Sequence, residues 1–92
     1  MELPKEIKDA VEAIEALKES VYKDYEKEYN YIIENKVTDE KRLDDLLDKL
    51  LDYYEDKRFE DMFWNLLNYV ETFDEGLGAM YRRVEKILTQ GY

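Results

Sequence analysis

Carboxylates gather on one side of a predicted helix in the middle of the chain, where they could hold a cation or a basic side chain. At about 100° per residue they share an arc of about 100° that only Lys41 interrupts. Like charges at this spacing repel by about 0.2–0.5 kcal/mol per pair, so the arrangement costs helix stability. Two interpretations stay open, a solvated acidic face and an interaction surface for a basic partner. The residues of the arc are Asp44, Asp45, Asp48, Asp52 and Glu55.

The chain lacks most of the side chains that enzymes use for catalysis. The chain has no histidine and no cysteine, so the usual general base, the commonest metal ligand and a thiolate are all missing. Ser20 is the only serine, and it lies within a predicted helix without a base beside it. Aspartates on a helix, without a loop that supplies further oxygens, bind divalent cations weakly. We therefore expect no enzyme activity, no metal and no cofactor.

A second group of polar residues lies on the most regular apolar helix, Phe59 to Asp74, which carries the only tryptophan, Trp64. Its hydrophobic residues recur at steps of three and four, the period of a helix with one buried face. Glu71 falls inside that apolar arc. Its carboxylate is either half-buried and paired, for which Arg82 or Arg83 is near enough in sequence, or an edge group that reaches water.

Hydrophobic periodicity predicts four helices that position these groups: Pro4 to Asn35 first, Asp39 to Glu55 second with Thr38 as N-cap, Phe59 to Phe73 third, and the last after Asp74 as N-cap. Gly76 and Gly78 weaken the start of the last helix by about 1 kcal/mol each, which favours a late or irregular start. Their small size also lets this helix approach its neighbour closely. Four amphipathic helices predict an all-α fold, a four-helix antiparallel bundle with a long first helix, in one domain over residues 1–92.

The outer helices are expected to close the core with one apolar stripe each. The first stripe is Ile7, Val11, Ile14, Leu17, Val21, Tyr25, Tyr29 and Ile32, and the last is Leu77, Met80, Tyr81, Val84, Ile87 and Leu88. The second half of this helix carries Tyr22, Tyr25, Tyr29 and Tyr31, which suit either an edge of the core or a binding surface, and general burial tendencies favour the core edge. If the first helix extends beyond the others, this tyrosine-rich end would be free for a partner.

The charge balance selects among partners. The chain holds 24 acidic and 14 basic residues, a formal net charge of −10. Such a surface repels nucleic acid and anionic membranes and attracts basic proteins at rates that fall with salt. No apolar run reaches membrane-spanning length, and the N-terminus lacks the layout of a signal peptide. We expect a soluble, cytoplasmic protein that binds neither nucleic acid nor membrane.

The stretch from Asp56 to Tyr81 resembles the small all-α immunity proteins of bacterial polymorphic toxin systems. The matching positions are Phe63-Trp64, Leu66-Leu67, Val70-Glu71 and Phe73-Asp74, and Asn68 stands where those proteins have a histidine. The resemblance implies a cytoplasmic protein without catalysis of its own that binds and neutralises a cognate toxin domain. A basic toxin domain, such as a nuclease, is the expected partner. On this interpretation Trp64, Asn68 and Glu71 are structural, as core or buried polar residues, and the acidic arc together with Tyr53 contacts the partner.

Two other functions fit the same residues. An acidic decoy of phage or mobile-element origin would imitate nucleic-acid phosphates and accept several basic partners, whereas an immunity protein discriminates sharply. A structural or regulatory bundle would form a homodimer through the face from Tyr22 to Ile33.

Overall fold

The computed structural model describes residues 4–90 and contains four α-helices. They are α1 (Lys5–Glu34), α2 (Glu40–Leu51), α3 (Lys57–Glu71) and α4 (Glu75–Gln90). No strand occurs in the described part of the chain, so the all-α prediction is confirmed.

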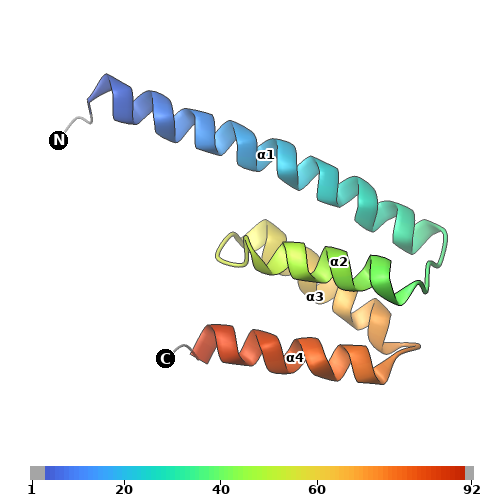
Figure 1. Ribbon diagram of the computed structural model, residues 1–92. Coiled ribbons are helices and arrows are strands. Elements are labelled where there is room, and N and C mark those ends of the chain that lie inside the picture. The colour runs from blue at the N-terminus through green and yellow to red at the C-terminus, as the bar shows by residue number, and fades with distance from the viewer. Residues whose placement is uncertain (1–3, 91–92) are drawn as a thin grey trace.

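The α2–α3 hairpin lies in the middle, with α1 along one side and α4 along the other (Figure 1). Successive helices run in opposite directions in this view. Within residues 4–90, α1 packs on α2 and α3 but makes no packing contact with α4. The four helices therefore form an open arrangement whose two outer members do not meet.

The core is centred on α3, as its apolar period predicts. Aromatic packing joins α1 to this core, because Tyr22 and Tyr25 meet the ring of Phe59 edge-on at centroid distances of 5.4 and 6.0 Å. Phe73 was expected on the same buried face, but it is exposed because α3 ends at Glu71 and the helical register ends there. The fully buried large side chains are Ile32, Leu43, Leu47, Leu50, Phe59, Phe63, Leu66, Leu67 and Val70.

Several helix ends differ from the predictions, among them both ends of α3, which spans Lys57–Glu71 instead of Phe59 to Phe73. Asp39, and not Thr38, caps α2 by accepting a hydrogen bond from the backbone N–H of Lys41 at 3.1 Å. The second helix ends at Leu51 instead of Glu55, because Asp56 adopts an extended backbone and its carboxylate caps α3, which begins at Lys57. The last helix begins at Glu75 without delay despite its glycines, since Asp74 accepts a hydrogen bond from the N–H of Leu77 at 3.0 Å.

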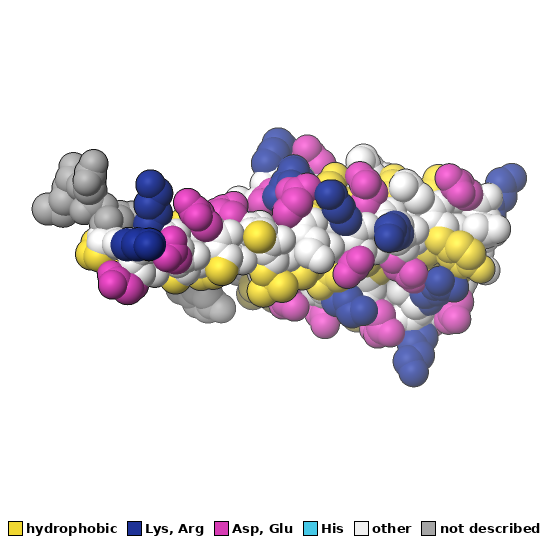
Figure 2. All heavy atoms as spheres, turned by 90° about the horizontal axis from the view of Figure 1, so that it is seen from above, with side chains coloured by type: hydrophobic (Ala, Val, Ile, Leu, Met, Phe, Trp, Pro, Cys, Tyr) yellow, Lys and Arg dark blue, Asp and Glu magenta, His cyan; other side chains and the backbone are white. Residues whose placement is uncertain are grey.

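The first helix is much longer than its neighbours. At 1.5 Å per residue, the 30 residues of α1 span about 45 Å and the 12 residues of α2 about 18 Å. The short turn after Glu34 pins the C-terminal end of α1 to the start of α2, so the N-terminal half projects. We call residues 5–17 the α1 arm; Figure 2 shows a row of hydrophobic side chains along this projecting end.

The two predicted outer stripes are therefore only partly buried. Ile7, Val11, Ile14 and Leu17 on the α1 arm are exposed, which corrects their assignment to the core. Tyr22, Tyr25 and Tyr29 pack on the core, as the core-edge interpretation predicts, whereas Tyr31 is exposed. The end of α1 that extends beyond the other helices is the N-terminal one and not the tyrosine-rich one. On α4, Leu77 and Tyr81 are buried, whereas Met80, Ile87 and Leu88 are exposed because no helix covers that side.

Candidate partner-binding surface

Asp44 is the one predicted contact carboxylate that the fold uses internally. The Tyr81 hydroxyl of α4 donates to the Asp44 backbone oxygen at 3.0 Å and also to the Asp44 carboxylate. Burial, and then this carboxylate, raise the pKa of the Tyr81 phenol. Asp44 is half-buried and joins α2 to α4, so it is a structural residue and not a free contact group.

The remaining carboxylates of the arc, Asp45, Asp48, Asp52 and Glu55, are exposed. Within residues 4–90 none of the four forms an ion pair with a lysine or arginine. Asp52 and Glu55 lie in the turn after α2 rather than on the helix, where backbone N–H groups bond to the third residue back, as Tyr53 does to Leu50 at 3.2 Å. The result is an acidic surface that runs from α2 into the turn.

Three arginines that could neutralise this surface are engaged elsewhere. Arg42 donates from Nε and Nη2 to the two carboxylate oxygens of Glu28, at 2.6 and 3.2 Å, and this pairing holds the pKa of the Glu28 carboxyl below its usual range. Arg58 contacts Asp56 and lies 2.5 Å from Glu19. The third arginine, Arg82, forms an ion pair with Glu71 of α3.

Tyr53, the aromatic member of the predicted contact set, is half-buried. Its ring stacks on Phe59 at a centroid distance of 4.8 Å and meets Tyr25 edge-on at 6.2 Å. The ring therefore closes the core at the turn, and it also lines a groove of about 230 Å³ between the α1 arm and the turn. The groove is lined by Ile14, Leu17, Lys18, Asp52, Tyr53 and Glu55.

This groove brings together residues from two separate predictions. Asp52 and Glu55 were expected as contacts, whereas Ile14 and Leu17 were expected in the core. The apolar pair is therefore the part of the surface that sequence reasoning missed. The signal that could have found it is the difference in length between the first two helices, since a 12-residue helix cannot cover a 30-residue one.

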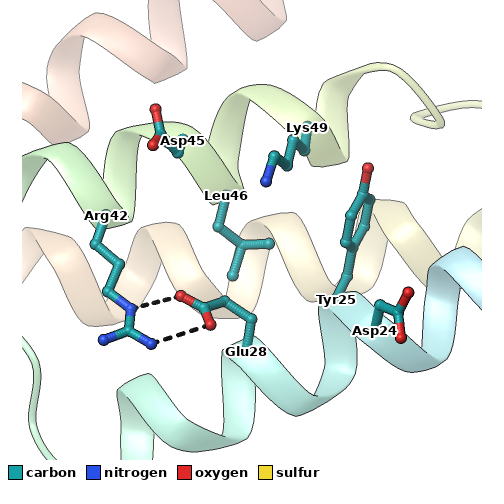
Figure 3. Close-up of a pocket in the computed structure, with 7 residues that line it drawn as sticks. All are labelled: Asp24, Tyr25, Glu28, Arg42, Asp45, Leu46 and Lys49. Atoms are coloured by element: carbon teal, nitrogen blue, oxygen red, sulfur yellow. Dashed lines mark hydrogen bonds and ion pairs between the residues drawn. The ribbon is translucent and has the colours of Figure 1, made fainter.

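A second groove, of about 400 Å³, lies between α1 and α2 (Figure 3). The Arg42–Glu28 pair crosses it, and Arg42 also lies 4.3 Å from the ring centroid of Tyr31. Asp24 of α1 and Asp45 of α2 also line this groove, together with Lys49. The two aspartates extend the acidic surface from α2 onto α1.

Trp64, Asn68 and Glu71 were predicted as structural groups. Asn68 is exposed, so its assignment as a buried polar residue is wrong; its position on α3 faces away from the neighbouring helices. Glu71 is half-buried, and both of its oxygens accept from Arg82, at 2.6 and 2.7 Å. This pairing lowers the pKa of the Glu71 carboxyl. Arg82 also lies 5.4 Å from the ring centroid of Trp64.

The indole of Trp64 begins a short hydrogen-bond chain. Its Nε1–H donates to the Tyr54 hydroxyl at 2.8 Å, and this hydroxyl donates to Glu85 of α4 at 3.0 Å. Burial, and then the Glu85 carboxylate, raise the pKa of Tyr54 to about 12. The chain joins α3, the turn and α4.

The described residues contain no cluster of three acidic side chains that could hold a metal ion. None of the described helices has the length and the hydrophobicity needed to cross a bilayer. Comparisons with protein-family profiles, with curated proteins and with solved structures give no match.

Proposed function

We propose that this protein is an immunity protein that binds and neutralises a cognate toxin domain with a basic surface, without catalysis of its own. The observation that carries the proposal is the set of exposed carboxylates Asp45, Asp48, Asp52 and Glu55, which have no basic partner within residues 4–90. The resemblance of Asp56–Tyr81 to immunity proteins supports the same function.

The physical reason is the cost of leaving these charges together. Repulsion along α2 lowers helix stability, and Asp52 lies at the C-terminal end of α2, where the helix dipole disfavours a negative charge. A basic partner would relieve both effects on binding. The complementary fields also accelerate the encounter, since electrostatic steering raises association rates by about 10- to 1,000-fold.

In this proposal the antiparallel bundle with its long first helix is a scaffold that fixes the acidic surface on one side. The internal ion pairs Arg42–Glu28 and Arg82–Glu71 hold α1 to α2 and α3 to α4. The surface then meets its partner with little rearrangement, which favours fast and selective binding.

The test is growth rescue on co-expression with the cognate toxin domain. The variant with Asp48→Lys and Asp52→Lys should fail to rescue, whereas Glu34→Lys, which reverses one exposed charge at the far end of α1, should rescue like the native chain. Rescue by the double variant would exclude this surface. Binding of several unrelated basic proteins with similar affinity would support the decoy function instead.

A further inference from the structure

The α1 arm carries an apolar stripe that nothing covers within residues 4–90. Ile7 is 49% exposed, Val11 45%, Ile14 63% and Leu17 64%. These side chains recur at steps of four, three and three, so they share one face of the helix. Such a stripe on an otherwise charged helix has the shape that a second helix covers in helix–helix recognition.

Charges along the edges of the stripe show what kind of helix fits. On the helical wheel Glu6 borders one edge, and Glu15 with Lys8 borders the other. Lys18 falls within the arc of the stripe, but its ammonium lies 3.4 Å from the Asp56 carboxylate, so its charge is already compensated. The arm thus offers an apolar face with edges that carry more acidic than basic groups.

The inner end of the stripe adds to this charge. Ile14 and Leu17 lie in the groove of about 230 Å³ beside Asp52 and Glu55 of the turn. A second copy of this chain would bring the same acidic edges and a further net charge of −10 against them. A helix with basic residues beside its apolar face complements both features.

We propose that the α1 arm and the groove at its base bind an amphipathic, basic helix of the partner protein. The apolar face of that helix covers the stripe, and its basic edge reaches Asp52 and Glu55. This inference rests on the proposed function, since it assigns the docking element of the same partner. It makes the α1 arm a recognition element rather than an incomplete part of the core.

The probe is a synthetic helical peptide of about 18 residues with leucines at heptad positions a and d and lysines at e and g. Binding to the full chain is followed by fluorescence anisotropy at physiological salt. The chain with Ile14→Gln and Leu17→Gln, which changes two exposed residues without changing charge, should bind at least 10-fold more weakly. Ala16→Gln, on the opposite face of the arm, should bind like the native chain.

Several results would overturn the inference. If a scrambled peptide of the same composition binds as tightly, or if the double variant binds unchanged, charge alone accounts for the interaction. If sedimentation shows a native dimer that the double variant loses, a second copy covers the stripe. If the toxin domain binds but the peptide does not, the docking of a helix on the α1 arm is refuted while the proposed function stands. If the peptide binds but the toxin domain does not, the arm binds a basic helix and the proposed function is refuted.

Discussion

Gly78 of α4 is a position where the addition of one methyl group should loosen the packing of α4 on α3. A Cβ at this buried glycine would lie 2.4 Å from Cγ of Glu71 and 3.2 Å from its carboxylate carbon. In an open helix Gly→Ala stabilises by about 1 kcal/mol. Here the methyl group must displace the Glu71 side chain near its base, and overpacking of this kind costs about 1–3 kcal/mol.

The same displacement breaks the Glu71–Arg82 ion pair. Glu71 retains 28% of its side-chain exposure and Arg82 50%, so the pair is screened and contributes about 0.5 kcal/mol. Together these terms predict that Gly78→Ala lowers the free energy of unfolding by about 0.5–2.5 kcal/mol. For a chain of this size, a loss in the middle of that range corresponds to a melting temperature lower by about 6–12 °C.

Gly76→Ala is the matched control. Its Cβ would meet only the Asp74 carboxylate, at an ordinary contact distance of 3.6 Å, so this variant should be as stable as the native chain or more stable. Urea unfolding followed by Trp64 fluorescence measures both. Adding Glu71→Ala to Gly78→Ala removes the obstructing side chain and should recover most of the loss. Two results would show that a Cβ at position 78 does not clash with Glu71. One is equal stability of the two glycine variants, and the other is a double variant whose loss of stability equals the sum of the losses in Gly78→Ala and Glu71→Ala.

Further predictions concern pH, hydrogen bonding and helix ends. The carboxyls of Glu28, Asp56 and Glu71 have pKa values below their ordinary 4.5, 3.8 and 4.5, so their contribution to stability is present above about pH 4.5 and is lost as the pH falls; Glu71→Gln should reduce this acid dependence in unfolding titrations. Tyr54→Phe removes two hydrogen bonds and should cost about 1 kcal/mol and change Trp64 emission. Because the pKa of Tyr54 is raised from 10.0 to about 12, the contribution of this residue to the free energy of unfolding is present below pH 10 and is lost between pH 10 and 12. Tyr54→Phe should lack this loss of stability between pH 10 and 12. Lys36 has a positive φ of 50° after α1, so Lys36→Gly should stabilise by about 0.5 kcal/mol, and a lower melting temperature would contradict this. Asp52→Lys should raise the free energy of unfolding by about 0.5 kcal/mol, because it places a cation at the C-terminal end of α2; destabilisation would show that Asp52 serves the fold.

The elements of the fold could be predicted because each has a local cause. The regular apolar period of α3 indicates its central place, and the six α3 residues of that period before Phe73 are buried. Asp74 caps α4 as its position before Glu75 indicates. The predictions from local sequence were wrong at helix ends. There the N-cap of α3 at Asp56 requires an extended backbone, so the second helix ends before its predicted last turn.

Hydrophobic periodicity could not predict which part of a long apolar stripe is covered by another helix. Ile14 and Ile32 belong to the same stripe of α1, yet Ile32 is fully buried and Ile14 is exposed. Their difference comes from the lengths of the helices alongside, which is a property of the assembled fold. Asp44 shows the same limit, because only the packing of α4 brings the Tyr81 hydroxyl to its carboxylate.

The most direct test of the proposed function is calorimetric binding to a candidate cognate toxin domain, at low and high salt. We expect tight one-to-one binding that weakens as the salt concentration rises. With Asp48→Lys and Asp52→Lys the affinity at low salt should fall about 10-fold or more, and the salt dependence should become shallower. Tight binding that neither salt nor the double variant changes would contradict the claim that the exposed carboxylates of α2 and its turn recognise the partner.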